Sequence, residues 1–230
     1  MGFGFLVYGY LMLIDYGVEI NADYGIGFDI FPDILGYILF FLALKNLSRH
    51  AKGFSRAKSI CTLLIFIGAV TLVAQLFSLT GIWLKYLSII LSCTEYVKYP
   101  LLLLLHIGIM DGIHSLALDV DLPKLSDKAS IGRIISIIYY CTGICMIVYE
   151  LGFGTPTGKA ATIYSSIGIC FQILFYLMFF YNFCVLFSSY RQICYEGDEN
   201  MDGPEKNPLS LLYNKIKEKT EKSDESDENK

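Results

Sequence analysis

Long uncharged apolar runs constrain this chain more than any other feature. No charged residue falls between Lys58 and Lys85, and a second uncharged run extends from Ala160 to Tyr190. A helix needs roughly 20 apolar residues to cross the hydrocarbon core of a bilayer. Only 17% of the 230 residues are charged, whereas soluble domains carry about a quarter. The sequence therefore predicts a membrane protein with several membrane-spanning helices.

We predict an all-α, polytopic fold in which residues 1–195 form a transmembrane helical domain. The six predicted membrane segments are 2–20, 30–45, 60–83, 86–118, 133–151 and 160–189. The first segment is weak because Asp15 and Glu19 interrupt it. The fourth is longer than a bilayer is thick, and Pro100 is expected to kink it because proline removes a backbone hydrogen-bond donor.

Basic residues predict the orientation, because cytoplasmic loops are enriched in lysine and arginine. The opposite side of the predicted topology holds only Lys85 and Lys159. Both termini are therefore expected in the cytoplasm, as an even number of spans requires. The basic residues of the two predicted cytoplasmic loops, 45–58 and 119–133, are Lys45, Arg49, Lys52, Arg56, Lys58, Lys124, Lys128 and Arg133.

Residues 196–230 form a predicted cytoplasmic tail. Within it, the segment 208–219 has lysines on one helical face, and its other face carries Leu209, Leu212, Tyr213 and Ile216. Such a helix docks against the inner leaflet or the protein itself, or binds a protein partner. The final residues are too polar to pack and are expected to be disordered.

The string FDIFPDILGYILFFL places two carboxylates, Asp29 and Asp33, before an apolar run. If both were helical they would share one face, and their repulsion would favour binding of a metal ion, an alkali cation or a proton. The alternative is that Pro32 and Asp33 simply begin a helix, whose dipole favours an acidic first turn. Gly36 and Tyr37 would then permit close packing and anchor the membrane interface.

The longer string FDIFPDILGYILFFLALKNLS resembles the N-terminal signature of a family of small, uncharacterised integral membrane proteins of clostridia-type bacteria. The resemblance covers roughly residues 1–58. It implies a bacterial cell (inner) membrane protein and carries no activity. The positions that match the D-I-x-P-D-x-x-G-Y-I-L pattern are Asp29, Ile30, Pro32, Asp33, Gly36, Tyr37, Ile38 and Leu39.

The fourth segment holds a second group of ionisable residues, which are costly inside a membrane and therefore indicate function. Glu95 and Lys98 are three residues apart and can pair on their own helix. Glu95 and His106 lie about 20° apart in helical projection and would line one polar stripe. The stripe suits a proton or cation path, and the alternative is an ion pair that fixes helix packing, with His106 bonded to the backbone.

Other chemistry has weaker support. Asp111 and His114 are weak candidates for metal ligands near the inner interface. No hydrolase, zinc-protease or phosphate-binding motif is visible, so we predict no cofactor and do not expect an enzyme. A membrane-embedded hydrolase that uses a cysteine and a histidine stays open as a third choice. Nucleic-acid binding is not expected, because anionic lipid explains the basic loops better.

The sequence thus favours a transporter or channel component for a cation or small solute. The predicted pathway consists of Asp29 and Asp33 on the outer side and of Glu95, Lys98 and His106 deeper in the membrane. The alternative is a non-catalytic membrane scaffold, or an accessory subunit of a larger complex, in which these charges serve packing and topology.

Overall fold

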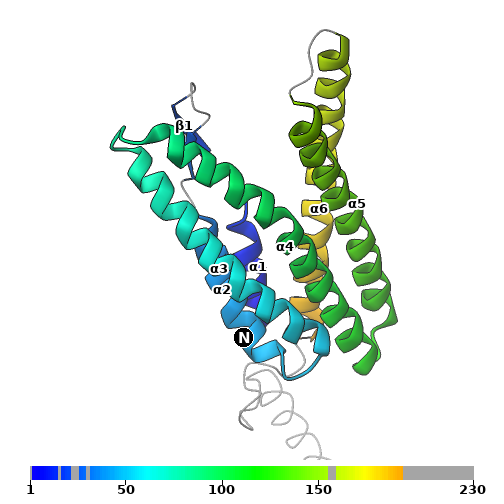
Figure 1. Cartoon of the computed structure of the whole chain (residues 1–230). Helices are drawn as coiled ribbons and strands as arrows, with labels where there is room; N and C mark the ends of the chain where they lie inside the picture. Colours follow the sequence, from blue (N-terminus) through cyan, green and yellow to red (C-terminus); the bar gives the residue numbers. More distant parts are fainter. Residues whose placement is uncertain (1, 15–16, 22–25, 30–31, 155–158, 194–230) are drawn as a thin grey trace, which may run out of the picture.

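The computed structural model describes residues 2–14, 17–21, 26–29, 32–154 and 159–193 (Figure 1). These residues form six helices and one short β-hairpin. The predicted helix at 208–219 and the disordered end lie outside the described residues. The elements are α1 (Gly2–Leu11), β1 (Gly17–Asn21), β2 (Ile26–Asp29), α2 (Asp33–Leu47), α3 (Lys52–Ser78), α4 (Leu84–Asp119), α5 (Pro123–Phe153) and α6 (Lys159–Ile193).

Four of these helices, α3 to α6, are long and apolar enough to cross a membrane. Their outward faces carry large apolar side chains such as Phe66 and Phe180, each more than half exposed. Soluble proteins rarely expose apolar surface on this scale. Helices α1 and α2 have 10 and 15 residues, fewer than the roughly 20 that a span needs. The helical, membrane-type class is thus confirmed, with four candidate spans.

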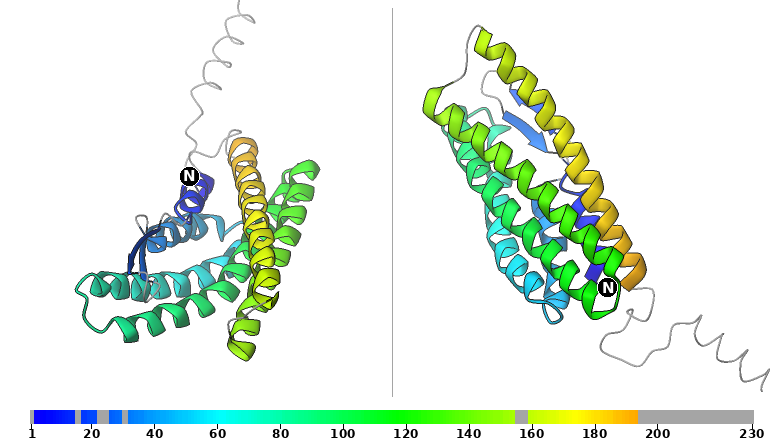
Figure 2. Two further views of the ribbon diagram at one scale, coloured as in Figure 1. Left: turned by 90° about the horizontal axis from the view of Figure 1, so that it is seen from above. Right: turned by 90° about the vertical axis from the view of Figure 1, so that its right-hand side faces the viewer.

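The six helices form a closed ring. Each helix packs against the next in the chain, and α1 packs against α6. Figure 2 shows α1 and α2 between the α3–α4 pair and the α5–α6 pair. The hairpin lies at the same end of the bundle as the connection from α3 to α4, whereas α1 begins at the opposite end (Figure 1).

Helices α3 and α4 approach so closely that their backbones touch. A Cβ atom on Gly53 of α3 would lie 2.7 Å from the carbonyl oxygen of Gly108 on α4. A Cβ atom on Gly108 would in turn lie 3.0 Å from the Cβ of Ala57. Small residues four apart permit such backbone contact between membrane helices, where packing replaces the hydrophobic effect. The pair Gly53 and Ala57 therefore sets the distance between α3 and α4.

The predicted first segment is wrong beyond α1. The helix ends at Leu11, and the chain continues into an antiparallel hairpin in which Gly17 pairs with Asp29. Glu19, one of the two charged residues that weaken the apolar run, lies within β1. Asp29 is the last residue of β2, so it does not share a helix with Asp33.

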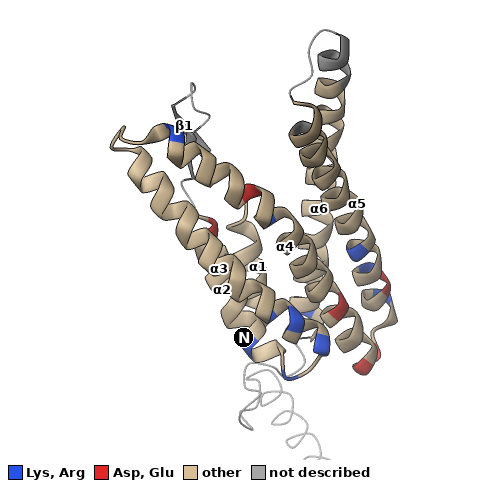
Figure 3. Ribbon diagram, in the orientation of Figure 1, with Lys and Arg blue, Asp and Glu red and all other residues tan. Residues whose placement is uncertain are grey.

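The predicted loops 45–58 and 119–133 are largely helical, because α3 begins at Lys52 and α5 at Pro123. Pro123 suits the first position of a helix, where its missing N–H group costs nothing. The basic residues of these segments gather at the bundle end away from the hairpin (Figure 3). Helix α4 matches its predicted bounds closely and continues through Pro100.

Candidate functional site

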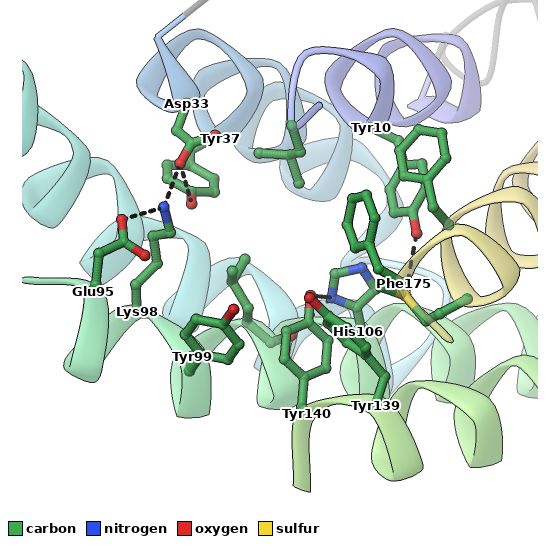
Figure 4. Close-up of a pocket in the computed structure, with 14 residues that line it drawn as sticks. Tyr10, Asp33, Tyr37, Glu95, Lys98, Tyr99, His106, Tyr139, Tyr140 and Phe175 are labelled. Atoms are coloured by element: carbon green, nitrogen blue, oxygen red, sulfur yellow. Dashed lines mark hydrogen bonds and ion pairs between the residues drawn. The ribbon is translucent and has the colours of Figure 1, made fainter. Parts of the chain in front are cut away.

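A cavity of about 100 Å³ lies at the centre of the bundle, between five of the six helices (Figure 4). Four of the five predicted pathway residues line it, namely Asp33, Glu95, Lys98 and His106. The fifth, Asp29, is the last residue of β2. The wall is largely aromatic, and its rings belong to Tyr10, Tyr37, Tyr99, Tyr139, Tyr140, Phe175 and Phe179.

Three charged side chains meet at one end of this cavity. Nζ of Lys98 lies 2.8 Å from Oδ2 of Asp33 and 2.8 Å from Oε1 of Glu95. Lys98 and Asp33 are 14% and 18% exposed, whereas Glu95 is 45% exposed. The hydroxyl group of Tyr37 also donates to Oδ2 of Asp33, at 3.4 Å. We call Asp33, Glu95 and Lys98 the charged triad. It carries two negative charges and one positive charge.

Local structure explains how Asp33 reaches this position. Pro32 stands at the N-cap of α2 with φ −54°, a backbone angle that the proline ring enforces. Asp33 then lies in the first turn, where the helix dipole favours a carboxylate. The residue that starts α2 also pairs with Lys98, a contact that neither interpretation of the motif predicted.

The charged triad also borders a second, smaller space. A cavity of about 40 Å³ lies between α2, α3 and α4. Asp33, Glu95 and Lys98 line both this cavity and the central one. Thr71 and Gln75 of α3 supply polar groups to the smaller cavity. The triad therefore borders both cavities.

His106 lies in the wall of the central cavity, one turn after Leu102 on α4. Only 3% of its surface is exposed. Nδ1 lies 2.8 Å from the carbonyl oxygen of Leu102 and 3.3 Å from the hydroxyl oxygen of Tyr140. Because a carbonyl oxygen only accepts hydrogen bonds, Nδ1 carries the proton. Nε2 of the neutral ring is then an acceptor, and no hydrogen bond to it occurs among the described residues.

Aromatic contacts between helices hold the rest of the wall. The rings of Tyr10 and Phe179 stack with centroids 4.8 Å apart, and those of Tyr139 and Phe171 stack at 4.7 Å. Tyr10 also meets the ring of His106 edge to face, at 5.6 Å. Such pairs add stability beyond the area they bury. The predicted site lacked these tyrosines, although tyrosines inside apolar runs were visible in the sequence.

The remaining residues of the N-terminal motif serve packing. A Cβ atom on Gly36 would lie 2.9 Å from the carbonyl oxygen of Gly9, and the reverse distance is the same. Helices α1 and α2 therefore cross at these two glycines. Tyr37 is fully buried, and its carbonyl oxygen accepts a hydrogen bond from Sγ of Cys61 at 3.1 Å. The prediction that Tyr37 anchors the membrane interface is wrong.

Asp111 and His114 do not line the central cavity. Oδ1 of Asp111 lies 2.6 Å from Nη1 of Arg133. The hydroxyl groups of Ser126 and Ser130 lie 2.6 and 3.2 Å from Nδ1 of His114. Over the part of the chain that the structure describes, no three histidine, cysteine or acidic side chains are grouped as metal ligands. The metal hypothesis for this pair therefore stays a prediction.

Polar side chains continue beyond the cavity on α5 and α6. Nδ2 of Asn182 donates to Oγ of Ser136 at 2.8 Å, and both residues are fully buried. Asn182 follows Met178, which lines the cavity, by one helical turn. Its Oδ1 is the one buried side-chain nitrogen or oxygen atom without a hydrogen-bond partner in the described ranges.

No protein-family model, curated protein or solved structure matches the chain. The resemblance of the N-terminal motif to a bacterial membrane-protein family stays a prediction. The function is therefore argued from the geometry of the cavity and the triad.

Proposed function

We propose that the protein is a transporter or channel component that binds a small cation or polar solute in the central cavity. The observation that carries this proposal is the convergence of charged and polar side chains from separate helices on one cavity. Buried ionisable residues are costly in a membrane and mark ion and substrate pathways. Such a path would continue along the bundle in two places. One is the smaller cavity that the triad also borders, and the other is the polar pair formed by Asn182 and Ser136.

The sign of the charge favours a cation. The triad has one more carboxylate than it has ammonium groups, so its net charge is −1 when all three groups are ionised. The tyrosine rings add a second favourable term, because the face of an aromatic ring attracts cations. A low-dielectric wall strengthens both interactions relative to water.

The proposed topology has six membrane segments with both termini in the cytoplasm of a bacterial cell, at the inner membrane. The gathering of basic residues at one end of the bundle supports this orientation, because cytoplasmic ends are rich in lysine and arginine. Helices α1 and α2 complete the ring although they are short. In this topology they lie in the ring beside the longer helices, and the hairpin joins them on the outer side.

Flux measurements test the proposal. The purified protein is reconstituted in liposomes, and uptake of Na⁺, K⁺ and alkylammonium ions is measured. We expect uptake of at least one cation, with a loss of about tenfold or more in Asp33→Asn and Glu95→Gln, because each removes a charge from the cavity. Asp111→Asn is the matched control, since Asp111 is paired outside the cavity. Equal uptake in liposomes with and without the wild-type protein would reject the proposal.

The scaffold or accessory-subunit function is the second candidate. It is favoured by the internal pairing of Lys98 with both carboxylates, which suits a structural role. A scaffold predicts that Asp33→Asn lowers thermal stability and changes the recovery of protein partners, with no cation flux in any variant. Stability and flux measured on the same preparations therefore separate the two functions.

A further inference from the structure

The ring nitrogen Nε2 of His106 is an acceptor that needs a donor. His106 is almost fully buried in the wall of the cavity, and its Nδ1–H group is already bound to the carbonyl oxygen of Leu102. In Figure 4 a dashed line joins one ring nitrogen of His106 to the hydroxyl group of Tyr140, and none reaches the second ring nitrogen. Nε2 is therefore free to accept a hydrogen bond from a molecule in the cavity that His106 lines. A ligand that donates an N–H or O–H group makes that bond.

The side chains around His106 favour a donor group with a positive charge. Rings of Tyr10 and Tyr140 lie with centroids 5.6 and 5.2 Å from the imidazole, and Phe175 lines the same space. Aromatic faces attract a cation that has left water. Lys98 of the charged triad lies eight residues earlier on α4, or about 12 Å along the helix axis, and the excess negative charge of the triad attracts the same cation. Among the residues that the structure describes, no arginine or lysine other than Lys98 lines the cavity.

The volume of the cavity limits which kind of molecule can bring the donor group to His106. A cavity of about 100 Å³ holds several water molecules or one small solute. A bare alkali cation has no N–H group to donate to Nε2, so it does not satisfy His106. A quaternary ammonium ion is attracted by the rings and also lacks a donor. A primary ammonium ion with a short alkyl chain has the charge, the donors and an apolar part for the aromatic wall.

We infer that the central cavity binds a small primary alkylammonium ion, whose N–H group donates to Nε2 of His106 while its alkyl chain packs against Tyr10, Tyr140 and Phe175. This inference rests on the proposed function and names the chemical class of its substrate. The triad acts at a distance, as an electrostatic attraction for the incoming cation. His106 makes the contact that distinguishes an ammonium ion from other monovalent cations.

Calorimetric titration of the purified, full-length protein in detergent tests the inference. The probes are ethylammonium, tetramethylammonium and K⁺ chlorides at constant ionic strength. We expect ethylammonium to bind the wild type at least about tenfold more tightly than tetramethylammonium, because a hydrogen bond from a charged donor is worth that factor. Equal affinity for the two ions would overturn the inference, and this comparison needs no variant.

Variants then locate the contact. His106→Asn keeps a short amide near the position of Nδ1 and removes Nε2, so it should weaken ethylammonium binding by about tenfold. His106→Gln, whose amide oxygen reaches the position of Nε2, should retain more affinity than the asparagine variant. His114→Asn is the control on the same helix, outside the cavity. Ethylammonium affinity that is the same in wild type and His106→Asn would overturn the inference.

The results also separate this inference from the proposed function. Binding and flux of K⁺ or Na⁺ without ethylammonium binding would overturn the inference and leave the transport proposal standing. Absence of both binding and flux for every cation would overturn the two together.

Discussion

Removal of the Lys98 side-chain charge gives the sharpest test of the charged triad. Lys98→Met keeps an unbranched apolar side chain of similar length and deletes the ammonium group that holds Asp33 and Glu95 at 2.8 Å each. The two carboxylates are then left close to each other without a counter-ion. We expect a marked loss of stability with little change in the packing of α4.

The magnitude follows from the burial of each partner. Breaking a buried ion pair by removing one partner costs about 3–5 kcal/mol. Glu95 is nearly half exposed, so water compensates much of its lost pairing. Asp33 is mostly buried, but it keeps the hydroxyl group of Tyr37 and its place in the first turn of α2. We therefore expect about 3 kcal/mol, the lower end of that range.

A double-mutant cycle measures this value. The free energy of unfolding is determined by denaturant titration in mild detergent for wild type, Lys98→Met, Asp33→Asn and the double variant. Asparagine removes the unpaired charge, so the double variant should be more stable than Lys98→Met by about 1–2 kcal/mol. The reasoning would be refuted if Lys98→Met cost less than about 1 kcal/mol, or if the two substitutions were additive within about 0.5 kcal/mol.

Two further predictions concern packing and topology. Gly53→Ala should destabilise the protein by about 1–3 kcal/mol through overpacking against α4. The control Gly168→Ala, whose added Cβ meets nothing within 4 Å, should be neutral or stabilising by up to about 1 kcal/mol. Thermal unfolding in detergent compares the two variants, and similar losses of stability would contradict the backbone contact. In a cysteine-free background, Thr80→Cys at the hairpin end should react with a membrane-impermeant maleimide applied to intact cells, and Asn46→Cys at the basic end should react only after lysis. The reverse labelling pattern would contradict the proposed orientation.

The sequence predicted those parts of the fold that depend on local patterns. Helix α4 was expected over 86–118 and runs from Leu84 to Asp119, because an apolar run of that length specifies a helix by itself. Glu95 and Lys98 pair as their three-residue spacing predicts. Glu95 and His106 line one cavity, as their shared helical face predicts.

Features that depend on distant parts of the chain escaped prediction. Asp33 and Lys98 are 65 residues apart, and no periodicity connects them. The hairpin was missed because its strands are short and the apolar run before it favoured a continued helix. The aromatic wall was missed for a related reason, since a tyrosine in a span faces lipid or protein according to the helices around it. The resemblance, the topology and the transport function stay predictions.

The contact between α1 and α6 has a consequence for biosynthesis. Tyr10 reaches Met178 across 168 residues of sequence, and its ring stacks on Phe179 of the same helix. At about 5–20 residues per second, α1 waits on the order of ten seconds in the translocon or the bilayer before α6 is made. The triad, which needs only α2 and α4, can assemble during that interval. The ring closes last, so the wall of the cavity is completed only when the sixth helix leaves the ribosome.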